Sequence, residues 1–452
     1  MKMNIPSVRM RWVICSFTAG AAILAVGAMT RHTAKGLVAH EWGTFTSVQG
    51  SDGVLLDWRP LVTSRLPGFV YDWTKPGLNR RQAGQFAFTK GGMITLQRME
   101  TPVIYFYSDR DQTVDVSVGF PKGIITEWYP QVAQIGPAIV PVPKALAMLD
   151  NYVHKVGAKP AFTFASFVSR PACEASRAHW ANIEIKPARA NKDLAASLPS
   201  DQSGSHYFSA RETDADYLQI PSLVATNPAP ETEKFLFYRG AGSFATPLRV
   251  TAENEGAITV ANTGGEALKD IFVLSVQNRA GAFIHLNALA VGERRTVARA
   301  TESTPIATLS QKLADQMADA LTSQGLYRRE AEAMVKTWND SWFQEEGVRV
   351  LYVLPREWTD QTLPLTIEPA PREVVRVMVG RAEVITPGSE RQLLDFLTKA
   401  GQGDSSAREQ ALAQFRKMGR FAEPALRLVT KNLPSQANQT AWALLQASAR
   451  PL

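Results

Sequence analysis

Short runs of alternating apolar and polar residues, divided by Gly, Pro, Asn and Asp turns, constrain the fold of this chain most. In residues 40–48 (HEWGTFTSV), Trp42 falls on one face of a strand and Glu41 on the other. The turn sequence QGSDG and then VLLDW follow, so we expect a β-hairpin over residues 40–58. Four further runs predict an antiparallel meander: MITLQ (93–97), TPVIYFYS (101–108), TVDVSVGF (113–120) and GIITEWYPQ (123–131).

The middle of the chain also has strand spacing. HWANIEIKP (179–187), HYFSA (206–210) and EKFLFYRG (233–240) each predict a strand, whereas PKALAMLDNYVHKVG (143–157) predicts a helix. Five short strands between Gly and Asn turns then favour a β-sandwich of immunoglobulin-like character. They are TPLRVTAE (246–253), AITVANTG (257–264), IFVLSVQ (271–277), AFIHLNA (282–288) and RRTVARA (294–300).

The period changes from two to about 3.6 near residue 307. Two apolar-periodic segments, 307–324 and 327–343, flank Gly325, where a C-cap glycine is expected, so they predict a helical hairpin. GVRVLYVL (347–354) and EVVRVMVG (373–380) predict returning strands. From Ser389 onward, four short amphipathic segments predict a small α-helical domain.

The N-terminal segment differs from the rest of the chain. Three basic residues precede an uncharged apolar run over 12–29 (WVICSFTAGAAILAVGAM), and two more follow it. This is the pattern of a signal peptide or of an N-terminal membrane anchor, and a run of this length lies between the two. In either case we expect the chain after about residue 30 to be extracytoplasmic, either periplasmic or secreted.

Together these patterns predict a mainly β fold with α elements: β-sandwich-like domains, an inserted helical hairpin and a C-terminal α-helical domain. The expected organisation is a signal peptide or anchor (1–36), a β-rich domain with an irregular insert (37–205), an immunoglobulin-like segment (206–303), a helical hairpin with returning strands (304–388) and an α-helical tail (389–452).

Charge and cysteine content exclude some classes of function. Residues 1–36 hold five basic and no acidic side chains, which leaves +2 of the formal charge of +7 for the remainder. A body this close to neutral, without a basic patch, is not expected to bind nucleic acid. Outside the apolar run Cys173 is alone, so it forms no intramolecular disulfide and is interpreted as a small apolar residue.

The segment around His40 is the first candidate binding site. His40 and Glu41 do not form the zincin signature, because Thr44 stands where the second histidine is required. Neighbours on a strand also point to opposite faces, so they cannot both ligate one metal. The sequence predicts no metal site and indicates no particular cofactor. We therefore take His40, Glu41 and Trp42 as candidate binding residues, with buried strand residues as the alternative.

The candidate catalytic residues are dispersed. Glu100 and Glu127 lie among aromatic, strand-forming residues, and paired carboxylates perform acid–base catalysis in glycosidases. Trp128, beside Glu127, could stack on a sugar as a binding residue. His206 precedes a dense set of charges, including Arg211, and is the third catalytic candidate. The alternatives are carboxylates beside core aromatics and a solvated charge run.

YRGAGSFA (238–245) matches the glycine spacing of a dinucleotide-binding loop after a strand. That loop needs a helix N-terminus to hold the pyrophosphate, and here Thr246, Pro247 and more strand-like sequence follow. We therefore reject a dinucleotide site and expect a turn or bulge between strands. Arg239, within this motif, is kept as a candidate binding residue.

Four segments resemble a group of exported bacterial proteins without an assigned activity. They are HEWGTFTSVQGSDG (40–53), METPVIYFY (99–107), EKFLFYRG (233–240) and LPREWTDQTLPLTIEPAPREVVRVMVGRAE (354–383). The resemblance spans about residues 40–383, with a weaker match in the helical tail. It implies one exported architecture and supplies neither catalytic residues nor a cofactor.

The sequence favours a non-enzymatic ligand-binding or scaffold protein of the cell envelope, because histidine is scarce and no nucleophile motif occurs. An envelope protein or a polysaccharide is the expected partner, together with the membrane if the N-terminal segment stays uncleaved. The alternative is a hydrolase, glycosidase-like or metal-assisted, with a dispersed carboxylate and histidine site.

Overall fold

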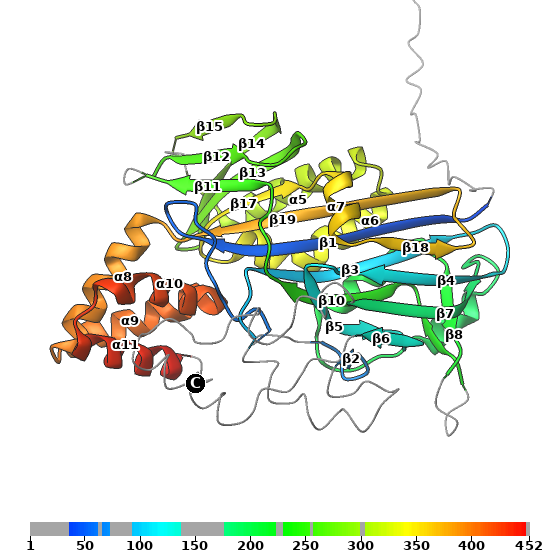
Figure 1. The fold of residues 1–452 in the computed structure, drawn as a ribbon, viewed down its shortest axis with the longest axis horizontal. Coiled ribbons are helices and arrows are strands. Elements are labelled where there is room, and N and C mark those ends of the chain that lie inside the picture. The colour runs from blue at the N-terminus through cyan, green and yellow to red at the C-terminus, as the bar shows by residue number, and fades with distance from the viewer. Residues whose placement is uncertain are drawn as a thin grey trace, which may run out of the picture. The chain divides into compact units, whose positions relative to one another are not determined.

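The computed structural model describes residues 36–61, 66–72, 93–136, 176–222, 229–253, 256–298 and 303–448 (Figure 1). Residues 34–452 form one compact unit. The predicted signal or anchor run, the predicted helix over 143–157 and Cys173 lie outside the described residues. Within the described ranges, no helix is both long and apolar enough to cross a membrane. The fold is mixed, with large β-sheets and C-terminal helices, in agreement with the predicted fold class.

A large sheet runs through the described part of the chain and contains ten of its strands. In spatial order these are β16 (Thr304–Pro305), β14 (Ala280–Leu289), β13 (Leu268–Gln277), β17 (Gly347–Val353), β19 (Glu373–Val384), β1 (Val38–Gln49), β3 (Gln97–Tyr107), β10 (Leu236–Gly242), β5 (Gly123–Tyr129) and β2 (Tyr71–Asp72). The large sheet therefore crosses the domain boundaries predicted at residues 205 and 303.

β1 lies in the interior of the large sheet, so the predicted hairpin is limited to its turn, where Gln49 forms an antiparallel bridge with Leu55. β1 pairs in parallel with β19 and antiparallel with β3, while residues 54–58 contribute only isolated bridges among the described residues. All twelve residues of β1 are buried, as expected of a strand covered on both faces. In the return segment Val54 is 52% exposed, whereas Trp58 is fully buried against the tail helices.

A second sheet packs against one face of the large sheet, and it replaces the predicted meander. β3 and β4 follow one another in sequence but lie in different sheets. β3 is buried almost throughout, whereas β4 alternates between buried and more exposed residues and covers the core with one face only. The second sheet comprises β18 (Leu365–Glu368), β4 (Gln112–Gly119), β7 (Arg177–Lys186), β8 (Tyr217–Ile220) and β9 (Glu231–Glu233), with β6 (Gln134–Gly136) paired to β7.

The predicted immunoglobulin-like strands form, but they divide between two sheets. β13 and β14 join the large sheet, whereas β11 (Leu248–Ala252), β12 (Ile258–Asn262) and β15 (Arg294–Val297) form a small antiparallel sheet. The strand predicted over 206–210 is wrong, because His206–Arg211 forms the 3-10 helix η3. Ser205 accepts a hydrogen bond from the N–H of Tyr207 at its start, and such a cap favours a helical turn over a strand.

The predicted helical hairpin and the four predicted tail helices are confirmed. α5 (Ile306–Ser323) and α6 (Arg328–Asn339) form the hairpin, and Gly325 between them has φ +109°. The tail contains α8 (Pro387–Gly401), α9 (Ser405–Met418), α10 (Ala422–Val429) and α11 (Ser435–Ser448). The shorter helices are η2 (Lys192–Ser197), η4 (Asp340–Gln344), α7 (Arg356–Thr362), η5 (Gly419–Phe421) and η6 (Thr430–Asn432).

Alternation along β1 divides the interior into two cores. Phe45 packs with the second sheet and the small sheet, whereas Trp42 packs with α5, α6 and η3. The hairpin α5–α6 therefore covers the face of the large sheet opposite the second sheet (Figure 1). The tail helices form a third apolar cluster, which includes Val48 and Trp58 from the β-region.

The close approach of Gly380 to Tyr352 supplies a test of this packing. The two are cross-strand partners in β19 and β17, and a Cβ on Gly380 would lie 2.3 Å from Cζ of the buried Tyr352 ring. We expect Gly380→Ala to lower the free energy of unfolding by about 2 kcal/mol in urea denaturation, because overpacking displaces the ring. Gly265→Ala, with no atom within 4 Å of the added Cβ, is the control and should leave stability nearly unchanged.

Candidate functional site

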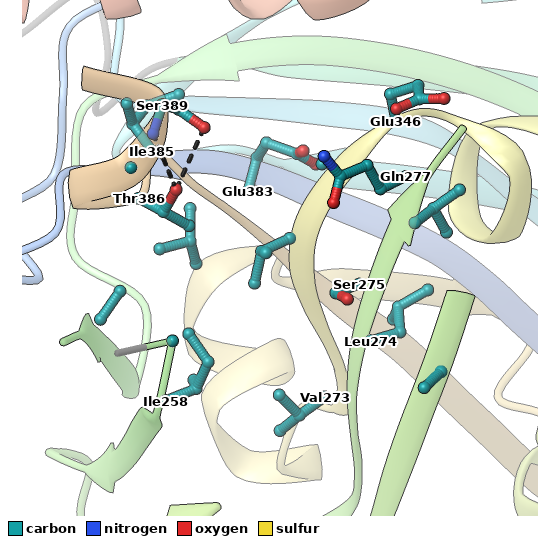
Figure 2. Close-up of a pocket in the computed structure, with 18 of the residues that line it drawn as sticks. Ile258, Val273, Leu274, Ser275, Gln277, Glu346, Glu383, Ile385, Thr386 and Ser389 are labelled. Carbon is teal, nitrogen blue, oxygen red and sulfur yellow. Dashed lines mark hydrogen bonds between the residues drawn. The ribbon is translucent and has the colours of Figure 1, made fainter. Parts of the chain in front are cut away.

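A cavity of about 760 Å³ lies where β13 and β14, the small sheet and the start of the tail helices meet (Figure 2). Its apolar lining includes Ile258, Val273, Ile284, Val297 and Val384. Figure 2 shows Glu383, Gln277 and Glu346 toward one end, and Ile258 and Val273 toward the other. Ligand sites in proteins are typically concave, and this cavity is concave with polar and apolar surface in about equal shares.

Thr386, Ser389 and Glu346 of the cavity lining take part in structural hydrogen bonds. Thr386 caps α8: its Oγ1 accepts from the N–H of Ser389 at 3.2 Å and lies 3.0 Å from Ser389 Oγ. Glu346 accepts from the N–H of Asn278 at 2.8 Å. The described lining contains serines but neither histidine nor cysteine, so none of its hydroxyls has a histidine base beside it.

Glu383 connects the cavity to a buried ion-pair network. Its carboxylate lies 3.1 Å from Nε of Arg349 and 2.8 Å from Nη2 of Arg381. Arg381 also binds Glu345 at 2.6 Å, and Phe421, which lines the cavity, lies against its guanidinium group. Both arginines are fully buried, and Glu383 is the member of these pairs that lines the cavity.

The network continues across the large sheet as a band that we call the charged row. Arg349 faces Glu383 across β17 and β19, Arg381 and Arg98 both face Thr46 of β1, and Arg239 faces Glu127 across β10 and β5. The charged row comprises Arg98, Glu100, Glu127, Arg239, Glu345, Arg349, Arg381, Glu383 and Arg420.

Glu100 shows how the charged row fixes the ionisation of its members. It lies 2.8 Å from Arg420 and 3.9 Å from Arg98. Burial alone would raise the pKa of Glu100, but the neighbouring arginines outweigh it and lower that pKa to about 2. Burial lowers the pKa of Arg98 to about 10, with Glu100 acting in the opposite direction. Both groups therefore remain charged at neutral pH.

His40 faces the helical hairpin. Its Nδ1 lies 2.7 Å from Oε2 of Glu330 in the first turn of α6, and Tyr107 donates to the other oxygen of that carboxylate at 2.6 Å. Glu330 also accepts from the N–H of Tyr327 at 2.8 Å, and the Tyr327 ring lies 4.4 Å from the imidazole. His40 thus fixes the start of α6 within the core.

Glu41 points the opposite way from His40, as alternation in a strand requires. It lies 2.5 Å from Nε of Arg376, its partner across β1 and β19, and it accepts from the hydroxyl of Tyr238. Arg376 binds Asp360 as well, at 2.7 Å. The two neighbouring side chains do not face a common ligand. Among the described residues, no group of three or more His, Cys, Asp or Glu is arranged to hold a metal ion.

The remaining sequence candidates occupy different environments. Trp42 and Trp128 are fully buried, so Trp128 presents no ring face to a sugar. Arg239 donates to the hydroxyl of Thr101. Against the effect of burial, Glu100 and Glu127 both raise the pKa values of Arg98 and Arg239. His206 is exposed and has no hydrogen bond or ion pair with Glu100 or Glu127 among the described residues. None of the sequence candidates lines the cavity.

Sequence reasoning missed the cavity and most of the charged row. Arg349 and Arg381 lie inside otherwise apolar strand runs, VRVLYV and VMVGRAEV, and a charge in such a run signals a buried ion pair. Arg420 gives no comparable signal, because it occurs in a helical tail with many other basic residues. The cavity is lined by several separate segments between residues 252 and 421, so no local sequence motif predicts it.

Comparison with known proteins adds little to this site. No family model matches the chain, and no match to a curated protein was found. The chain is weakly similar to the yeast delta-COP-I mu-homology domain complexed with the Dsl1 WxWxV peptide, with a TM-score of 0.26 and 8% identity over 77% of this chain and 98% of that chain. A second structure of the yeast domain gives a TM-score of 0.27 at the same identity and coverage. Similarities this low say nothing of what the chain binds.

The lowered pKa of Glu100 predicts a pH dependence of stability. Ionised Glu100 stabilises the fold above its ordinary pKa of 4.5, and this contribution is lost as the pH falls towards about 2. We expect Glu100→Gln to reduce the free energy of unfolding at pH 7 by about 3 kcal/mol. The difference from the parent should shrink between pH 4.5 and pH 2 in urea titrations.

Glu332→Gln is the matched control, because Glu332 is exposed and pairs with Arg328 on the surface of α6. Its effect on stability should stay below about 1 kcal/mol at every pH. A constant difference between Glu100→Gln and the parent across the acid range would contradict the assignment of a charged, arginine-bound Glu100.

Proposed function

We propose that this chain is a non-enzymatic binding protein of the cell envelope that takes its ligand in the cavity beside Glu383. The cavity itself carries the proposal: it offers a concave lining of mixed polar and apolar surface, without a histidine, a cysteine or a paired catalytic carboxylate in its described part. The envelope location rests on the apolar N-terminal run and its basic flanks. A concave surface with both apolar side chains and polar groups supports a binding function.

The lining indicates the kind of ligand. Apolar side chains from β12, β13, β14 and β15 suit a hydrophobic body. The charged lining consists of Glu253, Glu346 and Glu383 against Lys417, and Glu383 is already neutralised by Arg349 and Arg381. A neutral molecule with both apolar surface and hydrogen-bond donors therefore fits this cavity better than an anion does.

The charged row argues against the hydrolase alternative. A glycosidase-like pair needs one carboxyl that is protonated near neutral pH, and hence one with a raised pKa. Arginines lower the pKa of Glu100 to about 2, so it cannot act as that acid. Glu41 is likewise held by Arg376, and exposed His206 supplies no base to Glu100 or Glu127 among the described contacts. These acids stabilise the sheet.

Titration with a neutral, environment-sensitive dye such as Nile red tests the proposal. Ser275 lies on the cavity side of β13, in register with Ala282 of β14, and both line the cavity. We expect saturable dye binding to the parent chain and an affinity at least about tenfold lower in Ser275→Phe, because the ring fills the cavity.

Thr113→Phe is the control, since Thr113 is an exposed strand residue on β4 that does not line the cavity. It should bind the dye as the parent does, and thermal melts should show that both variants are folded. Equal dye affinity in Ser275→Phe and the parent would overturn the cavity as the site. Efficient turnover of a glycoside, ester or phosphodiester would overturn the non-enzymatic assignment.

A further inference from the structure

Phe421 lies between two arginines at the junction of the tail and the large sheet. The guanidinium carbon of Arg381 is 5.1 Å from the centre of the Phe421 ring, and that of Arg420 is 4.9 Å from it. Arg381 comes from β19, whereas Arg420 and Phe421 belong to η5 between α9 and α10. One aromatic ring therefore holds two cationic groups close together.

Each of these two arginines has nitrogen donors that its ion pairs do not use. Arg381 uses Nη2 for both Glu345 and Glu383, and Arg420 uses Nη1 for Glu100. Nε and Nη1 of Arg381 and Nε and Nη2 of Arg420 are buried and have no hydrogen-bond partner among the described residues. Four cationic N–H-bearing atoms thus surround one ring without an acceptor in the described part of the chain.

Buried donors of this kind call for an acceptor. An unpaired N–H on a charged group is costlier to bury than a neutral one, and a guanidinium fork matches the spacing of two oxygens on one anion. The surroundings are already rich in positive charge, because Arg98 and Arg239 add to Arg420 around Glu100. Burial is the main cause of the lowered pKa of Arg98; Glu100 opposes it, and Arg239 and Arg420 add to it.

The group lies close to the surface. The Arg420 side chain is 14% exposed, whereas its partner Glu100 is 2% exposed. Nε and Nη2 of Arg420 are themselves covered, so an anion that binds them must displace the side chains over them. It need not displace Glu100, which is bound to Nη1.

We propose that Arg381 and Arg420 form a binding site for a phosphate-class oxyanion at the junction between β19 and η5. This site goes beyond the proposed function, since neither arginine lines the cavity, and since the site is cationic whereas the charged residues of the cavity lining are mainly acidic. Phe421 and Glu383 line the cavity and also contact Arg381 of the proposed anion site. Free phosphate and the phosphoryl group of a monoester both present the oxyanion that this site would bind.

Thermal unfolding of the full chain with added phosphate tests the site. Inorganic phosphate and phenyl phosphate are titrated separately, with sodium chloride holding the ionic strength constant. We expect a saturable rise in Tm, because a ligand that binds only the folded state stabilises it by mass action. A rise with inorganic phosphate identifies a free-ion site, and a rise with phenyl phosphate alone identifies a monoester site. A phosphate response no greater than that to chloride would overturn the proposal.

Variants separate the site from general charge effects. Arg420→Met should abolish the saturable rise, and Arg420→Lys, which keeps a charge opposite Glu100 but removes the fork, should weaken binding at least about tenfold. Arg408→Met, at an exposed position of α9, should respond as the parent does. An unchanged response in a folded Arg420→Lys variant would refute the site. Neutral dye binding to the cavity is measured in parallel, so failure of either proposal can be recognised separately.

Discussion

The parallel pairing of β1 with β19 is the interaction on which the rest of the structure depends. Its register runs without a break from Val38 opposite Glu373 to Gln49 opposite Val384, and so it joins the start of the described chain to a strand more than 300 residues later. Every strand of the large sheet is placed outward from this pair. Within it, Glu41 and Arg376 form a buried ion pair, which fixes the register because a shift of one residue would leave both charges unpaired.

Local patterns predicted the elements well and their partners poorly. The hairpin α5–α6, with Gly325 between its helices, was predictable because helical periodicity and capping depend on near neighbours. β1 was predicted as a strand, but its partners were not, because both of its faces are covered and the matching surfaces come from distant segments. β3 and β4 were assigned to one meander for the same reason: adjacency in sequence was taken for adjacency in a sheet.

The candidate site was less predictable still. The acids that sequence reasoning selected, Glu41, Glu100 and Glu127, are buried within the sheets, where arginines from other strands or the tail surround them. Sequence shows the acid but not the opposing cation, so a structural ion pair and a catalytic carboxylate look alike. What remains for function is the cavity and the junction around Phe421, and both are assembled from segments that lie far apart in the sequence.

A double-mutant cycle between Glu41 and Arg376 tests most directly whether the acids of the first strand hold the sheet together. Glu41→Gln, Arg376→Met and the double variant are compared with the parent by urea denaturation at pH 7. The account predicts a coupling energy of about 2–3 kcal/mol. It also predicts that each single substitution lowers the free energy of unfolding by more than the loss of an exposed ion pair would. A coupling energy near zero, with β1 still paired to β19, would contradict it.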